Sequence, residues 1–501
     1  MAQSSSDAQP AGKSQPLPPE LLRVAGVVLI GLLVMQLDGT MVSVALNTLA
    51  HDLSASVATL QWVVTAYLLA LMVGMPLAGW AADRFGPRTM WIVSLAVFLV
   101  GSVLCGLSTS IWMLVAARVL QGLGGGMMVP VGQAMLMRLA GMEHRAKLVA
   151  LMAIPGMIGP TLGPVLGGVI VDGIDWRWMF FINIPIGVIA FLVAGRNLPN
   201  MKAETAAKLD VLGVLLLVPG LVAIVYGFSR AGAVGFGSGQ VIALLAVGGA
   251  LLAGFGVHAA RPNVDALVSM QMFKYRGFAT SCTLLLLVGL TMGAGIVQPL
   301  FLQQVHGESP MSTGVLLVAF GVGSVVTSVL LGRVFNKLGP RLVGVVGIVL
   351  AIAGAAIYPM FDAGTSRVLI ITAMLVSGVG LAMVVLTMST ALYVGLPPQQ
   401  IARATGASRI FQQLGLSAGT AVISVVLQIQ LSDQTDRAPD GTVGPTGLAH
   451  AYSTTFWWGV GFLVLAVVPT LFLPKTVVAP APVPRQAAEA AQSQGAQPQE
   501  A

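Results

Sequence analysis

Two charged side chains lie deep inside long apolar stretches of this sequence. Asp38 interrupts the run VAGVVLIGLLVMQLDGTMVSVAL, and Arg118 interrupts the run WMLVAARVLQGLGGGMMVPV. A charged residue at the centre of a membrane helix costs at least about 2.5 kcal/mol, so such residues indicate a functional site. Burial and a nearby opposite charge both control when a carboxyl group holds a proton. An acid and a base in such surroundings are therefore suited to moving protons.

The stretches that carry these residues predict two membrane-spanning helices, near 24–46 and 112–137. At a rise of 1.5 Å per residue, Asp38 lies roughly 5 Å and Arg118 roughly 9 Å from the middle of its helix, toward the same membrane face. We therefore expect the two groups to interact, directly or through water, and to couple protonation to a change of shape. The alternative is structural: neighbouring helices satisfy Asp38, and Arg118 is held in a static ion pair.

The composition excludes a soluble protein. Of 501 residues, 56% are hydrophobic and 9% are charged, and the mean hydropathy is +0.89, whereas soluble domains carry about 25% charged residues. Apolar runs of about 20 residues recur along the chain, which is the length of a helix that crosses a bilayer. The first run is too long for a signal peptide. Cys105 and Cys282 lie in apolar runs and predict neither a disulfide framework nor a metal site.

Fourteen apolar runs predict an all-α membrane protein with fourteen transmembrane helices. The expected spans lie near 24–46, 60–81, 89–109, 112–137, 148–171, 178–197, 209–228, 239–259, 278–304, 312–335, 342–361, 367–393, 407–430 and 455–474. The polar, Pro- and Ala-rich tails at 1–21 and 476–501 are expected to be disordered.

The basic residues predict the orientation of the chain, because loops that are rich in Lys and Arg stay in the cytoplasm. Of the 25 Lys and Arg residues, all fall on the side of the two termini except Arg118 in the membrane and four on the other side, which are Arg177, Arg230, Arg367 and Arg437. Both termini are therefore expected in the cytoplasm. The net charge of +7 follows from this bias and does not indicate nucleic-acid binding.

An internal repeat divides the chain into two similar halves. GWAADRFGPR, from Gly79 to Arg88, aligns without gaps to GRVFNKLGPR, from Gly332 to Arg341. Each copy follows the second span of its half, so the halves share one orientation, as in transporters built from parallel repeats. The expected units are a six-helix bundle at 22–200, a linker and inserted helix hairpin at 201–262, and a second six-helix bundle at 263–475. The hairpin carries almost no charge, which favours a packing or partner role over a transport path.

Five segments together resemble the major facilitator superfamily, and more narrowly its fourteen-span drug:proton antiporter branch, the EmrB/QacA type. They are LDGTMVSVALNTLAHDL, GWAADRFGPRT, LVAARVLQGLGGGMMVPVGQ, GPTLGPVLGG and WRWMFFINIPIG. The resemblance implies the major facilitator fold, with two six-helix bundles around a central site. It also implies that Asp38, in an LD-x-T motif, and Arg118, in an R-x-x-Q-G motif, take part in proton transfer.

The repeated loop is expected to act as a cytoplasmic gate, although a loop that only sets the topology is the alternative. Its residues are Gly79, Asp83, Arg84, Gly86 and Arg88 in the first copy, and Gly332, Asn336, Lys337, Gly339 and Arg341 in the second. The glycines permit a tight turn and close helix contact. Asp83 is suited to pairing with a base, and the arginines to reaching helix C-termini or lipid phosphates. Because Asn336 replaces Asp83 in the second copy, a charge-dependent latch should be stronger in the first half.

The fifth expected span is rich in small residues and proline, at Gly159, Pro160, Gly163, Pro164, Gly167 and Gly168. Glycines four residues apart let helices pack closely, and proline bends a helix. The resemblance identifies this segment as the antiporter signature and implies a pliable hinge; ordinary small-residue packing is the alternative. Adaptable Met and polar side chains predict a substrate cavity lined by Met35, Gln36, Thr40, Gln133 and Gln298.

Together these features predict a proton-coupled exporter of hydrophobic small molecules, cations among them, that works by alternating access in a bacterial inner membrane. No cofactor is expected, since the proton gradient supplies the energy. The expected partners are membrane lipids, protons and the substrate; no docking motif for a periplasmic adaptor is recognisable. No Walker A or HExxH motif is present, and no enzyme activity is expected. The alternatives are an exporter of an endogenous lipid, siderophore or metabolite, a non-transporting sensor or scaffold, and a passive channel.

Overall fold

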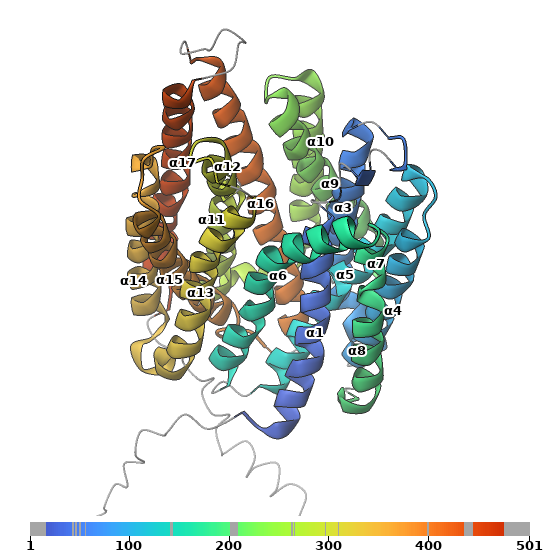
Figure 1. Cartoon of the computed structure of the whole chain (residues 1–501). Helices are drawn as coiled ribbons and strands as arrows, with labels where there is room; N and C mark the ends of the chain where they lie inside the picture. Colours follow the sequence, from blue (N-terminus) through green and yellow to red (C-terminus); the bar gives the residue numbers. More distant parts are fainter. Residues whose placement is uncertain are drawn as a thin grey trace, which may run out of the picture.

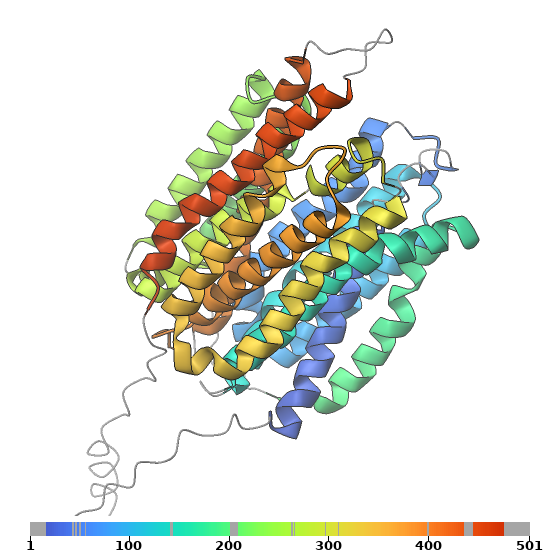
Figure 2. The ribbon, with the colours of Figure 1, turned by 60° about the vertical axis from the view of Figure 1, so that its left-hand side comes forward.

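The computed structural model describes residues 17–474, apart from gaps at 43–44, 46–47, 50–51, 56, 141–143, 201–208, 262–263, 265, 296, 309, 398–399 and 435–443. Helices run side by side in one bundle (Figure 1). The first residues of α1 and the last residues of α17 lie at the same end, called here the termini-side end (Figure 2); the opposite end is called the far end. Helix α1 begins at Pro19, within the tail that was expected to reach residue 21, and the tail at 476–501 lies outside the described residues.

The first half of the chain forms one helical bundle. Its helices are α1 (Pro19–Met41), α3 (Val57–Phe85), α4 (Pro87–Gly106), α5 (Ile111–Leu139), α6 (Arg145–Gly173), α7 (Trp178–Phe181) and α8 (Asn183–Asn197). Helix α5 packs along α3 and α4, and α1 packs between α6 and α8. Because each helix satisfies its own backbone hydrogen-bonding groups, the helices can lie in the hydrocarbon of a membrane. The apolar side chains that face inward form the core of the bundle.

The second half repeats this arrangement. Its elements are η1 (Met270–Lys274), α11 (Arg276–Ala294), α12 (Val297–Gln304), α13 (Pro310–Leu338), α14 (Pro340–Ala355), η2 (Tyr358–Met360), α15 (Arg367–Ala391), α16 (Ile401–Ser432) and α17 (Pro445–Leu471). Helix α15 packs along α13 and α14, as α5 does along α3 and α4 in the first half. The two halves meet where α6 lies against α13 and where α16 lies against α3 and α5.

The repeated loop folds alike in both halves. Gly86 and Gly339 both have positive φ, of 85° and 77°, and each is followed by a proline that begins the next helix. Positive φ is accessible to glycine at little cost, and proline is favoured in the first helical turn. The parallel repeat that the sequence predicts is therefore present in the backbone.

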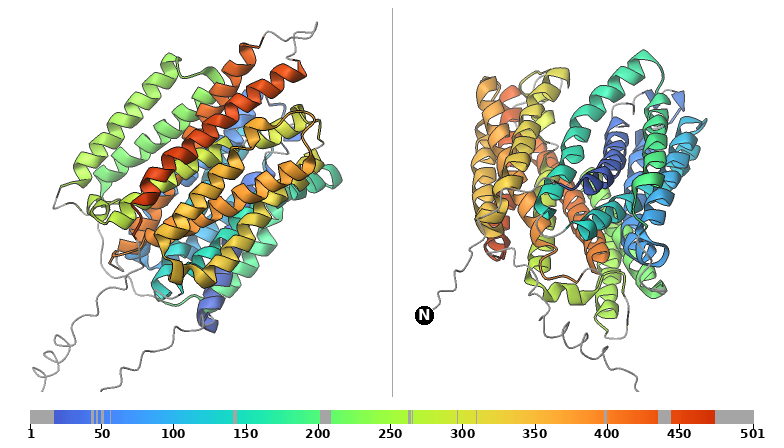
Figure 3. Two further views of the ribbon diagram at one scale, coloured as in Figure 1. Left: turned by 90° about the vertical axis from the view of Figure 1, so that its left-hand side faces the viewer. Right: turned by 90° about the horizontal axis from the view of Figure 1, so that it is seen from below.

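The inserted helix pair lies beside the junction of the two halves (Figure 3). It consists of α9 (Val211–Val234) and α10 (Gly239–Ala259), and α9 packs against both α3 and α16. Tyr226 stacks on Trp62 of α3, with the ring centroids 5.3 Å apart. At the termini-side end the pair is closed by a 2.8 Å contact between His258 Nε2 and Asp210 Oδ1.

Thirteen helices of the described residues are long and apolar enough to cross a membrane. The fourteenth expected span, 148–171, falls within α6, which has 29 residues and was not among the thirteen. The chain is therefore a multi-pass membrane protein with the all-α fold that the sequence predicts.

Candidate functional site

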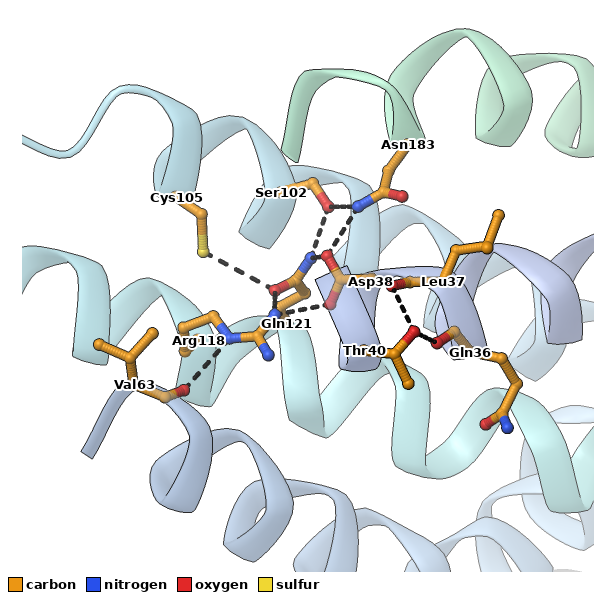
Figure 4. Close-up of polar contacts among 10 residues, drawn as sticks. All are labelled: Gln36, Leu37, Asp38, Thr40, Val63, Ser102, Cys105, Arg118, Gln121 and Asn183. Atoms are coloured by element: carbon orange, nitrogen blue, oxygen red, sulfur yellow. Dashed lines mark hydrogen bonds and ion pairs between the residues drawn. The ribbon is translucent and has the colours of Figure 1, made fainter. Parts of the chain in front are cut away.

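A buried polar network lies inside the first half, toward the far end, where α1, α4, α5 and the start of α8 meet (Figure 4). Asp38 comes from α1, Ser102 from α4, Arg118 and Gln121 from α5, and Asn183 from the first position of α8. Asp38 and Asn183 are each 1% exposed, and the other three are 0% exposed. A carboxylate and a guanidinium are thus shielded from both water and lipid.

Asp38 accepts three hydrogen bonds. Its Oδ2 accepts one from Arg118 Nη1 at 2.6 Å, and its Oδ1 accepts one each from Gln121 Nε2 and Asn183 Nδ2 at 2.8 Å. Charged hydrogen bonds of this kind are short and roughly twice as strong as neutral ones. The arrangement therefore places three donors around the two oxygens of the Asp38 carboxyl group.

Arg118 is held by groups from several helices. Its Nε donates to the Val63 carbonyl at 3.3 Å, and its Nη1 donates to Gln121 Oε1 at 2.6 Å as well as to Asp38. Its guanidinium carbon lies 3.9 Å from the centroid of the Tyr67 ring, in the range of a cation–π contact. Arg118 Nη2 and the Tyr67 hydroxyl oxygen are buried without a hydrogen-bond partner in the described part of the chain. In another conformation, Arg118 Nη2 and the Tyr67 hydroxyl group can gain the hydrogen bonds that they lack here.

Gln121 joins all parts of the network. Its Nε2 donates to Asp38 and to Ser102 Oγ, and its Oε1 accepts from Arg118 and, at 3.7 Å, from Cys105 Sγ. Asn183 Nδ2 also donates to Ser102 Oγ at 3.1 Å. The sequence did not assign Gln121, Asn183 or Ser102 to the site. Gln121 could have been found there, because a residue three positions after Arg118 shares its helix face.

A second cluster of charges lies at the termini-side end, around Asp83 of the repeated segment, which the structure places in the last turn of α3 and not in a loop. Asp83, which is 9% exposed, forms an ion pair with Arg138 of α5 at 3.2 Å and another with Arg403 of α16 at 3.6 Å. Arg403 belongs to the second half, so Asp83 links the two halves at this end. Gly79 allows the approach, because a Cβ atom there would lie 3.1 Å from Arg403 Cγ.

The remaining loop residues lie apart from this ion pair. Arg88 Nη2 donates to the Gly195 carbonyl near the C-terminus of α8, and Arg84 is exposed. In the second copy, Gly332, Asn336 and Lys337 belong to α13, but their side chains are outside the described ones. Gly339 makes the turn before α14, which starts with Pro340 and Arg341. The predicted difference in latch strength therefore stays a prediction.

The glycines of α6 face α1 on the side away from Asp38. A Cβ atom on Gly159 would collide with Gln36, one on Gly163 with Thr40, and one on Gly167 would lie 3.0 Å from the Met41 carbonyl oxygen. Thr40 Oγ1 also donates to the Gly159 carbonyl at 3.1 Å. A Cβ atom on Gly168 would have no neighbour within 4 Å, and the side chains of Pro160 and Pro164 are outside the described ones. The stripe thus fixes one face of the helix that carries Asp38.

The five residues expected to line a substrate cavity lie on several helices, and their role stays a prediction. Gln36 and Thr40 face α6, and Met35 packs toward Gly125 of α5. Gln298 lies within the second half, at a cavity of about 50 Å³ beside Tyr358. Gln133 lies at the junction of the halves.

Arg409 is a half-buried charge that the sequence analysis counted with the basic residues on the side of the termini, at the start of the expected span 407–430. Because α16 begins at Ile401 rather than near residue 407, Arg409 lies two turns inside the helix. Its Nε donates to Gln133 Oε1 of α5 at 3.2 Å, and its Nη1 donates to Gln412 Oε1 at 3.0 Å. It forms no ion pair with any acid in the described residues. Arg118 is therefore not the one deep base, and Arg409 is a further polar link between the halves.

No group of three or more His, Cys, Asp or Glu side chains gathers as a metal site in the described residues. The bundle, its parallel repeat and its charged network define a class of protein: a membrane transporter with two symmetric halves.

Comparison with known proteins identifies the family. Residues 28–420 match the model of the Major Facilitator Superfamily. The "Multidrug resistance protein B homolog" of Mycobacterium tuberculosis is 33% identical over 487 residues, which cover 91% of this chain and 90% of that protein. The chain belongs to the major facilitator superfamily.

Solved structures show the same fold. The human organic anion transporter MFSD10 (TETRAN) aligns with a TM-score of 0.62 at 19% identity, covering 90% of this chain and 100% of that one. A double-Trp mutant of XylE aligns with a TM-score of 0.61 at 16% identity, covering 91% and 96%. At these identities the likeness concerns the fold alone.

Proposed function

We propose that this transporter is a proton-coupled exporter of hydrophobic small molecules, lipophilic cations among them. The observation that carries the proposal is the Asp38–Arg118 pair, a titratable carboxyl held by three hydrogen bonds in a buried site. The name of the mycobacterial relative, a multidrug resistance protein homolog, supports the choice of substrate class. The few charged residues within the spans favour apolar cargo.

Protonation of Asp38 is the proposed coupling step. A proton on Asp38 removes the anion that compensates Arg118, and breaking a buried ion pair costs about 3–5 kcal/mol when one charge is left unpaired. Arg118 then has to find other acceptors, which favours a different packing of α1 against α5. Loss of the proton restores the pair and returns the bundle to the described arrangement.

The Asp83 cluster is the proposed gate at the termini-side end. In this structure Asp83 joins α3 to Arg403 of α16, and Arg409 joins α16 to Gln133 of α5. Opening this end requires that both links break. Removal of the charge of Asp83 or of Arg403 should therefore favour the form in which this end is open.

We place the termini-side end in the cytoplasm and the protein in a bacterial inner membrane. The bias of Lys and Arg toward the loops of that end supports this orientation. In this orientation the substrate enters from the cytoplasm while the Asp83 gate is open. Protons reach Asp38 from the far end, because Asp38 lies in the half of α1 that is nearer that end.

The test is flux in proteoliposomes with an imposed pH gradient, using a lipophilic cationic dye as the probe. Wild type is compared with Asp38→Asn and Arg118→Ala, and with Asp433→Asn as a control that removes a carboxylate outside the network. We expect gradient-driven flux of the two network variants to fall to the level of protein-free liposomes, and that of the control to match wild type. Asp38→Asn keeps the shape of the side chain, so we expect this variant to fold. Its thermal unfolding temperature checks that it does.

Undiminished gradient-driven flux by both network variants would refute proton coupling through this pair. Flux that ignores the pH gradient in wild type itself would instead indicate a passive channel. Absence of flux in a folded wild-type protein would favour the sensor or scaffold alternative.

A further inference from the structure

A cavity of about 460 Å³ opens at the termini-side end of the first half, far from the Asp38 network. It lies between the start of α1, the end of α5, His144 just before α6, and the end of α8. Leu21 and Val24 of α1 are buried and line it, together with Leu139 at the end of α5. Its volume is in the range of about 300–1,000 Å³ that is typical of small-molecule sites.

The charged lining of this cavity is mainly basic. Arg23 of α1 and Arg196 of α8 line it, and the acid among its lining residues is Glu20. Both arginine residues are exposed, and neither forms an ion pair with an acid in the described part of the chain. Two guanidinium groups facing one cavity are suited to bind a phosphate, since each offers a planar fork of N–H donors.

Two helix N-termini add to this positive potential. Pro18 precedes α1 and His144 precedes α6, and neither side chain caps its helix. Both residues line the cavity. The unpaired N–H groups of a helix start carry partial positive charge and favour an anion.

The position of the cavity indicates a lipid as the source of the phosphate. On α1 and α8, next to the cavity, the apolar side chains of Leu22 and Leu192 are 53% and 62% exposed. Such exposed apolar side chains on a membrane helix face the acyl chains of lipids. The cavity therefore opens where the apolar surface of the bundle ends, at the level of the lipid headgroups.

We propose that this cavity binds the phosphodiester headgroup of an anionic lipid of the proposed cytoplasmic leaflet. Arg23 and Arg196 contact the phosphate oxygens, and the apolar floor at Leu21 and Val24 receives the glycerol and the first carbons of the acyl chains. Basic pockets between membrane helices on the cytoplasmic side bind such headgroups. The bound lipid joins α1, the α5–α6 turn and α8, and so stabilises the half that contains Asp38.

Native mass spectrometry of the purified full-length protein tests this site. The protein is titrated with phosphatidylglycerol, with zwitterionic phosphatidylethanolamine, and with inorganic phosphate. We expect one phosphatidylglycerol to bind more tightly than further copies or than phosphatidylethanolamine. In the double variant Arg23→Gln/Arg196→Gln this affinity should fall by about thirtyfold, which corresponds to about 2 kcal/mol for two basic side chains.

Two further variants make the assignment specific. Arg261→Gln/Arg276→Gln removes the same charge from basic residues that do not line the cavity and should bind phosphatidylglycerol like wild type. Leu139→Trp fills the cavity without changing its charge and should weaken binding. Equal affinity in wild type and the Arg23/Arg196 variant would overturn the site, and binding of inorganic phosphate without preference for the lipid would overturn the lipid assignment. None of these measurements depends on transport, so they stand apart from the export proposal.

Discussion

Neutral side chains help to hold the Asp38–Arg118 ion pair in place. Gln121 and Asn183 supply two of the three hydrogen bonds to the carboxylate. An isolated pair in hydrocarbon would not recover the cost of removing two ions from water. The amides offset part of that cost, and they also fix which oxygen of Asp38 faces Arg118. A proton that arrives at Asp38 therefore disturbs its hydrogen bonds to three side chains at once, those of Arg118, Gln121 and Asn183.

Glu308 allows a test of electrostatics outside the membrane spans. Ser312 Oγ donates to its carboxylate at 2.5 Å, and Arg367 Nε donates at 2.8 Å. The hydrogen bond from Ser312, followed by Arg367, lowers the pKa of Glu308 below its ordinary value of 4.5. Because the folded pKa is lower than the unfolded one, the stabilisation is complete above pH 4.5 and is lost as the pH falls through the folded pKa.

We therefore predict that Glu308→Gln unfolds at a lower temperature than wild type at pH 7, and that this difference shrinks below about pH 4. The measurement is the thermal unfolding temperature of the purified protein over a series of pH values. Asp433→Asn, which removes an exposed carboxylate at the end of α16, serves as the control and should unfold at the wild-type temperature at pH 7. A difference between Glu308→Gln and wild type that stays constant down to pH 3 would contradict the prediction.

The residues at the two polar sites were only partly predictable from the sequence. Asp38 and Arg118 stand out because each is a charge in an apolar run. Their depths predicted an interaction, direct or through water, and the structure shows the direct one, at 2.6 Å. The partner of Asp83, Arg403, lies in the other half of the chain, and no local pattern links the two. Asn183 and Ser102 are common polar residues whose orientation depends on how helices rotate in the bundle.

Among the helices, α1 is held from two sides. One side carries Asp38, and the other is pressed against the glycine stripe of α6. Any rotation of α1 that follows protonation of Asp38 must therefore move Thr40 along that stripe. Glycine makes this contact possible, since a Cβ atom at Gly159 or Gly163 would collide with α1.

We predict that Gly163→Ala destabilises the protein by about 1–3 kcal/mol, the usual cost of overpacking, because the new methyl group collides with Thr40. The readout is the thermal unfolding temperature. Gly156→Ala in the same helix is the matched control, since no atom lies within 4 Å of its added Cβ. Alanine also has the higher helix propensity, so this control should be neutral or slightly stabilising. Equal effects of the two substitutions would show that the stripe is not a close contact.

Helix positions were easier to predict than helix ends. Long apolar runs set the position of each span, and the turns at Gly86 and Gly339 follow from glycine and proline in sequence. The start of α16 was missed by six residues because IARATGASR is polar, although Ile401 and residues 404–408 are buried. Hydropathy measures preference for lipid, and a polar helix surface that faces protein is invisible to it.

At the scale of the whole molecule, α9 occupies the junction of the two halves. It contacts α16 more extensively than α3, so we expect the hairpin to move with the second half during transport. Gly232 of α9 and Ser424 of α16 have Cβ positions 3.6 Å apart, within the range of about 3.5–4.5 Å found in disulfides. On the other side, Tyr226 stacks on Trp62 of α3.

Two cross-links test this assignment. We predict that a Gly232→Cys/Ser424→Cys disulfide leaves dye export unchanged, whereas a bismaleimide link between Trp62→Cys and Tyr226→Cys stops it. The native Cys105 and Cys282 are buried and should not react. Each pair is compared with its reduced or unlinked form, so that effects of the substitutions themselves cancel. Arrest by the first link with free export by the second would mean that the hairpin moves with the first half.

The hairpin also bears on how a chain of this kind can lengthen. Each membrane crossing exchanges one compartment for the other, so an addition of two crossings returns the polypeptide to the side from which it departed. One extra crossing would have turned the following six helices upside down and destroyed their correspondence with the first six. Parity, rather than the particular residues of α9 and α10, is what allowed new material to enter between two matched halves.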